Sequence, residues 1–246
     1  MALIPGVRPG VAASGRRRSR RPLRARLARL LLVLLITPSA LIFAYRHIDP
    51  PVTPLMLIRL TEGEAINKHW VPLEQISPHI TRAAIASEDN LFCSHSGFDV
   101  RALKQQIRTF RAGGRPRGAS TITMQVAKNI LLWPGRDLVR KGLEAVFTPQ
   151  IELLWSKQRI LEVYLNLVEL GPGLYGVEAA SQTLFGKRAS ALGRNEATRL
   201  MAILPNPREW SAVRPGPLVR ARVSAINERV NQLGALLDCA RVPPDE

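Results

Sequence analysis

Apolar residues recur every three or four positions through most of the chain after residue 76, the spacing of a helix with one buried face. Capping residues and glycines divide this pattern into successive helices. Ser77 and Pro78 open the first, which runs to about Leu91, and Asp99 caps the second, which ends at Gly113. The other predicted helices cover Ser120 to about Leu132, 136–156, 157–170, 175–185, 193–204 and 217–238. Because no segment alternates convincingly between apolar and polar residues, the sequence predicts a mainly α fold.

An uncharged apolar stretch at 30–45 precedes this helical region. It is slightly shorter than the roughly 20 residues of a membrane span, but Leu27 and Ala28 extend it if Arg29 snorkels from the helix end. A buried core helix and a cleaved signal peptide are the alternatives. A core helix is rarely apolar on every face, and the arginine-rich region before this stretch is long for a signal peptide. We therefore predict one N-terminal transmembrane helix at 30–45.

The predicted anchor divides the chain into five parts. These are a basic cytoplasmic tail at 1–29, the anchor at 30–45, a juxtamembrane segment at 46–76, a helical domain at 77–238 and a tail at 239–246. Prolines 50, 51 and 54 predict extended backbone in the juxtamembrane segment. Its apolar residues Leu55, Met56 and Ile58 are expected to face lipid in part.

The 246-residue chain carries 35 Lys and Arg against 19 Asp and Glu, a formal charge of +16. Nine arginines and no acidic residue lie in 1–29, so only +7 belongs to the remainder. Such a tail is typical of nucleic-acid binding or of membrane orientation. The apolar stretch that follows, and the lack of aromatic residues for base stacking in the tail, favour membrane orientation. Everything after Tyr45 is then expected to lie outside the cytoplasm, and no nucleic-acid partner is expected.

Length and an apolar content of 46% indicate one folded domain of ordinary size. Two cysteines, Cys93 and Cys239, exclude a disulfide-rich scaffold and a four-cysteine zinc site. Whether these two cysteines are buried thiols or form one disulfide is left open by the sequence. His95 and Cys93 alone make no metal-ligand set, and no dedicated metal-binding motif stands out.

Three blocks of polar residues are candidates for chemistry. Glu88 and Asp89 form an acid pair at a predicted helix end. A later helix begins with Ser120, Thr121, Thr123 and Gln125, followed by Lys128, where free backbone N–H groups attract anions. The third block places Arg136, Arg140 and Lys141 near Glu144. Each block also has a structural explanation: a solvated helix end, helix capping, and an i,i+4 ion pair.

Taken together and in order, these blocks resemble a known family. The segments are EDNLFCSHSG at 88–97, GASTITMQVAKN at 118–129, RKGLE at 140–144, KQRILEVYLN at 157–166, YGVEAA at 175–180 and ILPNP at 203–207. They are similar to the glycosyltransferase domain of bacterial peptidoglycan synthases (glycosyltransferase family 51), most closely to its monofunctional transglycosylases. The chain departs from that pattern at Met124, where a glutamine is usual, and at Arg220-Ala221-Arg222, where adjacent arginines are usual.

The resemblance implies a lysozyme-like helical domain that polymerises lipid II with inversion and releases undecaprenyl pyrophosphate. It makes Glu88 the general base and Glu144 the second catalytic carboxylate. The substrate-binding residues that it implies are Asp89, Ser120, Thr123, Gln125, Lys128, Asn129, Arg136, Arg140, Lys141, Tyr175, Asn206 and Arg222. Among these, Asp89 is expected to orient the loop or the substrate.

The resemblance also implies partners and a location. Lipid II and the nascent glycan chain are the expected substrates, the bacterial cytoplasmic (inner) membrane the expected site, and cell-wall synthesis or division proteins the expected partners. It leaves room for a divalent cation, Mg²⁺ or Mn²⁺, without naming a ligand set. A lysozyme-like or lytic enzyme that cleaves glycan is the alternative function, and the cluster of Lys128, Arg136 and Arg140 speaks against it. No Ser-x-x-Lys nucleophile motif is present, so no transpeptidase activity is expected.

Overall fold

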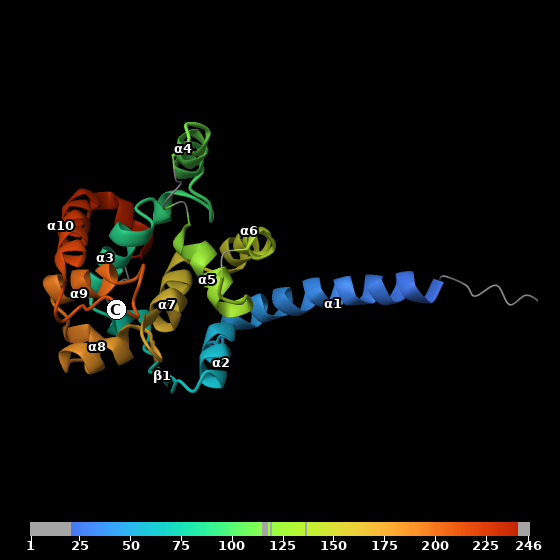
Figure 1. Cartoon of the computed structure of the whole chain (residues 1–246), viewed down its shortest axis with the longest axis horizontal. Coiled ribbons are helices and arrows are strands. Elements are labelled where there is room, and N and C mark those ends of the chain that lie inside the picture. Colours follow the sequence, from blue (N-terminus) through green and yellow to red (C-terminus); the bar gives the residue numbers. More distant parts are fainter. Residues whose placement is uncertain (1–20, 115–117, 119, 136, 241–246) are drawn as a thin grey trace, which may run out of the picture. The chain divides into compact units, whose positions relative to one another are not determined.

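The computed structural model describes residues 21–114, 118, 120–135 and 137–240, and the chain separates into two units, 1–37 and 38–246 (Figure 1). Helix α1 (Arg21–Tyr45) begins in the first unit and ends in the second. Its side chains Leu32, Val33 and Ile36 are exposed. Among the described residues, no helix combines the length and the apolar character that crossing a membrane requires. The anchor at 30–45 is therefore not confirmed and stays a prediction.

The segment that follows α1 contains a helix that the sequence analysis missed. Thr53 accepts a hydrogen bond from the N–H of Met56 at 3.2 Å, and Pro54 takes the first position of α2 (Pro54–Thr61). Met56 is fully buried. The predictions of extended backbone at Pro54 and of a lipid-facing Met56 are therefore wrong, because proline fits the first turn of a helix as well as it fits extended chain.

The rest of the second unit is mainly helical, as predicted. Its helices are α3 (Pro78–Glu88), α4 (Val100–Arg111), α5 (Ile122–Leu131), α6 (Leu138–Leu154), α7 (Lys157–Leu167), α8 (Val177–Phe185), α9 (Arg194–Ala202) and α10 (Pro217–Gln232). Short 3-10 turns are η1 (Leu73–Gln75), η2 (Phe92–Ser94), η3 (Ala189–Ala191) and η4 (Gly234–Ala240). The mainly α class is confirmed, whereas the likeness to lysozyme stays a prediction.

Helix boundaries follow the predicted caps with small corrections. Asp99 caps α4 through a hydrogen bond from Ala102 N–H at 2.9 Å, as expected. Thr121, and not Ser120, caps α5, since its hydroxyl accepts the N–H of Met124. Helix α3 ends at Glu88, where Asp89 leaves the helical conformation. The candidate base thus occupies the last position of a helix and not its interior.

A small three-stranded sheet contradicts the expectation that the chain has no strands. Its order is β1 (Asn67–Lys68), β3 (Leu174–Tyr175), β2 (Glu169–Gly171), with β1 parallel and β2 antiparallel to β3. The backbone passes closely here, because a Cβ on Gly173 would lie 2.3 Å from the carbonyl oxygen of Ala65. Strands of two or three residues are too short to produce an alternating pattern, which explains why the sequence did not predict them.

Two groups of packed helices create the setting of the functional site. Helices α3, α9 and α10 pack against one another, while α5 packs on both α6 and α7 (Figure 1). Along α7, Ile160, Leu161, Val163, Tyr164 and Leu165 are all fully buried. A helix buried on consecutive positions is surrounded by neighbours and forms the centre of the core.

The two cysteines form a disulfide between Cys93 in η2 and Cys239 in η4, with their Cα atoms 5.4 Å apart. The sequence had left this point open. The bond also places Cys239 within the folded domain, which was predicted to end at 238. Because 146 residues separate the two cysteines, the bond joins parts of the chain that are remote in sequence.

Candidate functional site

A cavity of about 1010 Å³ lies where α3, α4, α5, α6 and α10 approach one another, and we call it the central cavity. It contains both carboxylates that the sequence singled out, Glu88 and Glu144. Five basic side chains also line it, namely Lys128, Arg140, Lys141, Arg222 and Arg229. Two carboxylates beside a dense cluster of cations suit a reaction in which a base acts next to a leaving anion.

Glu88 reaches the cavity from the end of α3. Its Oε2 accepts a hydrogen bond from Gln125 Nε2 at 2.9 Å. No described residue donates a hydrogen bond to its other oxygen, Oε1. The carboxylate is therefore oriented from one side by α5 and offers the remaining oxygen as a proton acceptor, which is the geometry that general-base catalysis needs.

Asp89 lies beside Glu88, but both of its oxygens are occupied. Oδ2 accepts the N–H of Ile122 at 3.0 Å, and Oδ1 lies 2.8 Å from Nε2 of His95. Gly97 donates its N–H to Nδ1 of His95, so these hydrogen bonds assign the ring proton to Nε2, facing Asp89. Asp89 therefore holds the surrounding loop in place, and it also lines the central cavity. Its roles in orienting the loop and in binding substrate stay predictions.

Glu144 is buried and engaged by two cations on its own helix, α6. Arg140 pairs with Oε1, and Lys141 Nζ lies 2.8 Å from Oε2. Lys141 also donates to the hydroxyl of Ser120 at 3.0 Å, which joins α6 to the start of α5. The ordinary reading of Arg140 and Glu144 as an i,i+4 pair is thus correct, and the pair in addition faces the central cavity.

Lys128 on α5 lines the same cavity as the two carboxylates. Burial lowers the pKa of its ammonium below that of an ordinary lysine, and Arg140 and Lys141 lower it further, while Glu144 and Glu88 act in the opposite direction. The nearby hydroxyl of Tyr164 is fully buried, and its pKa is raised well above the usual range by burial and then by the charges of Glu88 and Asp89. The electrostatic field of this site thus acts on several groups at once.

The structure brings most of the predicted site residues together, but not all of them. Thr123 is fully buried and donates its hydroxyl to Glu152. Tyr175 is fully buried in β3, where burial raises its pKa to about 12. Asn206 donates to Glu209, and Asn129 does not line the cavity. None of these four lines the central cavity, so their contact with substrate stays a prediction. Arg136 lies outside the described residues.

Some residues of the cavity were missed. Helix α4 contributes Asp99, Ala102 and Gln105, and α10 contributes Arg229 in addition to Arg222. Arg222 and Arg229 are seven positions apart, a spacing that places both on one face of a helix. That spacing could have identified Arg229 from the sequence. For the α4 residues, no local signal exists, because only the fold brings them to the cavity.

The site does not fit a bound divalent cation well. Among residues in the described ranges, no three His, Cys, Asp or Glu side chains group as metal ligands. Both oxygens of Glu144 are paired with cationic side chains. We therefore derive no step of the chemistry through a metal.

With this geometry in place, comparison with known proteins becomes informative. The sequence profile of the Transglycosylase family matches residues 56–231. The chain belongs to the transglycosylase family. The matched region includes every residue that lines the central cavity, from Ser87 to Arg229. The resemblance found from the motifs is thereby confirmed.

Relatives in this family match over most of their length. A protein of Caulobacter vibrioides is 47% identical over 222 residues, 89% of this chain and 97% of that protein. One of Rhodospirillum centenum is 50% identical over 206 residues, 83% of this chain and 89% of that protein. One of Ectopseudomonas mendocina is 46% identical over 220 residues, 87% of this chain and 91% of that protein. Each of these proteins is named biosynthetic peptidoglycan transglycosylase.

Proposed function

We propose that the chain is a peptidoglycan glycosyltransferase of cell-wall synthesis and that it polymerises lipid II into glycan strands. Membership of the transglycosylase family and the names of its relatives support the activity. The observation that carries the proposal is the central cavity, in which Glu88, held through one oxygen by Gln125, shares one space with Lys128, Arg140 and Lys141. A base and a cluster of cations are what this transfer requires.

In the proposed reaction, the 4-hydroxyl of a GlcNAc unit attacks C1 of the MurNAc at the reducing end of the growing chain. Glu88 accepts the hydroxyl proton through Oε1 as the new C1–O bond forms. The bond from C1 to the pyrophosphate breaks on the opposite face, so the anomeric centre inverts. Lys128, Arg140 and Lys141 stabilise the charge that develops on undecaprenyl pyrophosphate.

The contacts of Glu144 define its part in this scheme. Since both of its oxygens are paired, the carboxylate holds Arg140 and Lys141 at the wall of the cavity. We assign it the positioning of these two cations around the leaving pyrophosphate, and not the donation of a proton. This assignment gives a specific role to the residue that the resemblance makes the second catalytic carboxylate.

We further propose that the enzyme works at the outer face of the cytoplasmic membrane, anchored by residues 30–45. Helix α4 supports this location, because Val100, Leu103, Ile107 and Phe110 are all exposed and share the spacing of one helix face. The disulfide is a second support, since such bonds persist in oxidising compartments outside the cytoplasm. At the membrane surface the enzyme meets its polyprenyl-linked substrate and other cell-wall synthesis and division proteins.

Incubation of the purified full-length chain with labelled lipid II tests the function. We expect glycan polymer from the unaltered chain and a loss of about 10²–10⁴-fold in Glu88→Gln with the circular dichroism spectrum unchanged. The glycan-cleaving alternative predicts instead loss of turbidity from isolated cell wall. Polymerisation by Glu88→Gln near the normal rate would contradict the assignment of the base, and cell-wall cleavage without polymerisation would contradict the function.

A further inference from the structure

The loop between α3 and α4 carries a set of contacts that the proposed reaction does not use. We call residues 89–97 the catalytic loop, because it starts directly after Glu88. Resting on the proposed function, we propose that the Cys93–Cys239 disulfide and Lys157 clamp this loop and thereby position the Glu88 carboxylate. Both are positioning groups that act through the loop, and neither touches substrate.

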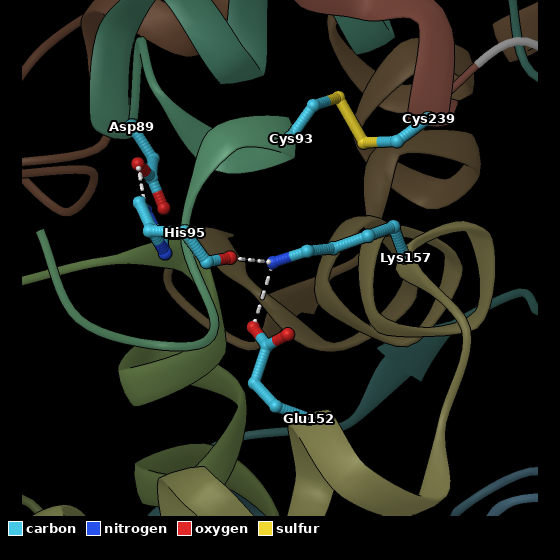
Figure 2. The surroundings of a disulfide bond; sticks show 6 residues. All are labelled: Asp89, Cys93, His95, Glu152, Lys157 and Cys239. Carbon is cyan, nitrogen blue, oxygen red and sulfur yellow. Dashed lines mark hydrogen bonds and ion pairs between the residues drawn. A yellow bond between two sulfur atoms is a disulfide. The ribbon is translucent and has the colours of Figure 1, made fainter.

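The catalytic loop is bonded to the start of α5. Asp89 is bonded to His95, as Figure 2 shows. It also accepts the N–H of Ile122, the first residue of α5. Thr121 adds a hydrogen bond from its hydroxyl to the carbonyl oxygen of Gly97 at 2.7 Å. Helix α5 also carries Gln125, which orients Glu88. A shift of the loop relative to α5 would therefore change the alignment of Glu88 directly.

Lys157 holds the loop from the side of α7. Its ammonium donates to the carbonyl oxygen of His95 and to Oε1 of Glu152, each at 2.8 Å, as Figure 2 shows. It also lies 4.5 Å from the centre of the Phe92 ring, within the range of a cation–π interaction. Glu152 in turn accepts the hydroxyl of Thr123. One ammonium group thus connects the loop to α5, α6 and α7.

The disulfide holds the loop from the opposite end of the sequence. Cys93 belongs to η2, a turn of three residues that has no side-chain cap. Its partner Cys239 lies in η4, which packs against both η2 and α7. Helix α10 precedes η4 in the chain and supplies Arg222 and Arg229 to the cavity. The covalent bond therefore closes a ring of the chain from Cys93 to Cys239, which includes α10, while Glu88 lies shortly before the start of this ring.

Positioning of this kind affects rate more than binding. A general base must lie within hydrogen-bond reach of its proton, and a misplacement of about 1 Å can cost on the order of 10²-fold in rate. We therefore expect Cys93→Ser with Cys239→Ser to lower kcat by about 10- to 100-fold. KM for lipid II should change by less than about twofold, because Lys128, Arg140 and Lys141 lie on α5 and α6, which the disulfide does not join. Reduction of the unaltered chain by a dithiol, which is itself oxidised to a cyclic disulfide, should have the same effect.

The experiment compares the full-length chain, the double variant, Lys157→Met and Lys157→Arg in lipid II polymerisation below their melting temperatures. Lys157→Met should show the same loss in kcat as the double variant, although its disulfide is intact. Lys157→Arg should show a smaller loss than Lys157→Met. Leu170→Ala is the matched control, because it removes a buried side chain from β2, outside the clamp. Its loss of stability should be similar to that caused by removing a disulfide, yet we expect it to keep kcat.

Hydrogen exchange provides a readout that does not depend on activity. The amides of Ile122 and Gly97 should exchange faster in the double variant and in Lys157→Met than in Leu170→Ala. Unchanged exchange at these amides, or a loss of kcat no greater than that of Leu170→Ala, would overturn the clamp. If the unaltered chain fails to polymerise lipid II, the proposed function fails, and exchange alone then decides whether the loop is clamped.

Discussion

Replacing Asp89 by asparagine provides a direct test of how the site is held. Asp89 is 6% exposed, and its two oxygens accept hydrogen bonds from Ile122 N–H and from His95 Nε2–H. An asparagine has only one acceptor oxygen, so its NH₂ group must face one of these donors. Turning the proton of His95 to Nδ1 does not relieve the conflict, since Gly97 N–H already points at that nitrogen.

The size of the effect follows from this arrangement. A hydrogen bond to a charged acceptor contributes about 1.5–3 kcal/mol, and at least one such bond is lost in the buried site. We therefore expect Asp89→Asn to lower the free energy of unfolding by about 2–3 kcal/mol and to reduce polymerisation together with it. Urea unfolding followed by tryptophan fluorescence measures the change in the free energy of unfolding, from the shift of the denaturation midpoint at constant m-value.

Asp49→Asn is the matched control for this measurement. Asp49 is paired with Arg159, but its side chain is 50% exposed, and exposed pairs contribute at most about 1 kcal/mol. A loss in Asp89→Asn no larger than that of Asp49→Asn would refute the view that Asp89 holds the catalytic loop to α5.

Three further predictions concern cations and the membrane. Because the pKa of Lys128 is lowered, its ammonium loses a proton at lower pH than an ordinary lysine. The rate of polymerisation should therefore fall as the pH rises into the alkaline range. Lys128→Arg should move that fall to higher pH in a rate–pH profile. Arg229→Gln should raise KM for lipid II by about tenfold, with a smaller effect on kcat, if its guanidinium binds substrate phosphate. Phe110→Ser should weaken binding to anionic lipid vesicles by about 10-fold or more in a sedimentation assay, since Phe110 is 69% exposed; unchanged sedimentation would contradict the role given to α4.

Local chemistry explains what the sequence could predict. Asp99 caps α4 as expected, and Glu88, Lys128 and Glu144 meet in one cavity because helix ends and helix faces have readable signals. These signals depend on neighbours a few residues apart. They are therefore present in the sequence before any tertiary contact is known.

Contacts between residues far apart in the chain explain what the sequence could not predict. The pairing of β1 with β3 joins residue 67 to residue 174, and no short-range pattern marks such a contact. The burial of Tyr175 and Thr123, which removes them from the cavity, likewise depends on packing around α7 and the small sheet. The start of α2 at Thr53 and Pro54 is different. The sequence does carry the signal of a helix start there, but the same proline is equally compatible with extended backbone.

The distance in sequence between the two linked cysteines has a consequence for biosynthesis. After Cys93 has been synthesised, another 146 residues must follow before its partner exists. At the usual rate of about 5–20 residues per second, this delay is on the order of ten seconds. If the catalytic loop is fixed only once the bond has formed, the chain carries Glu88, Lys128 and Glu144 well before it can reach its full rate.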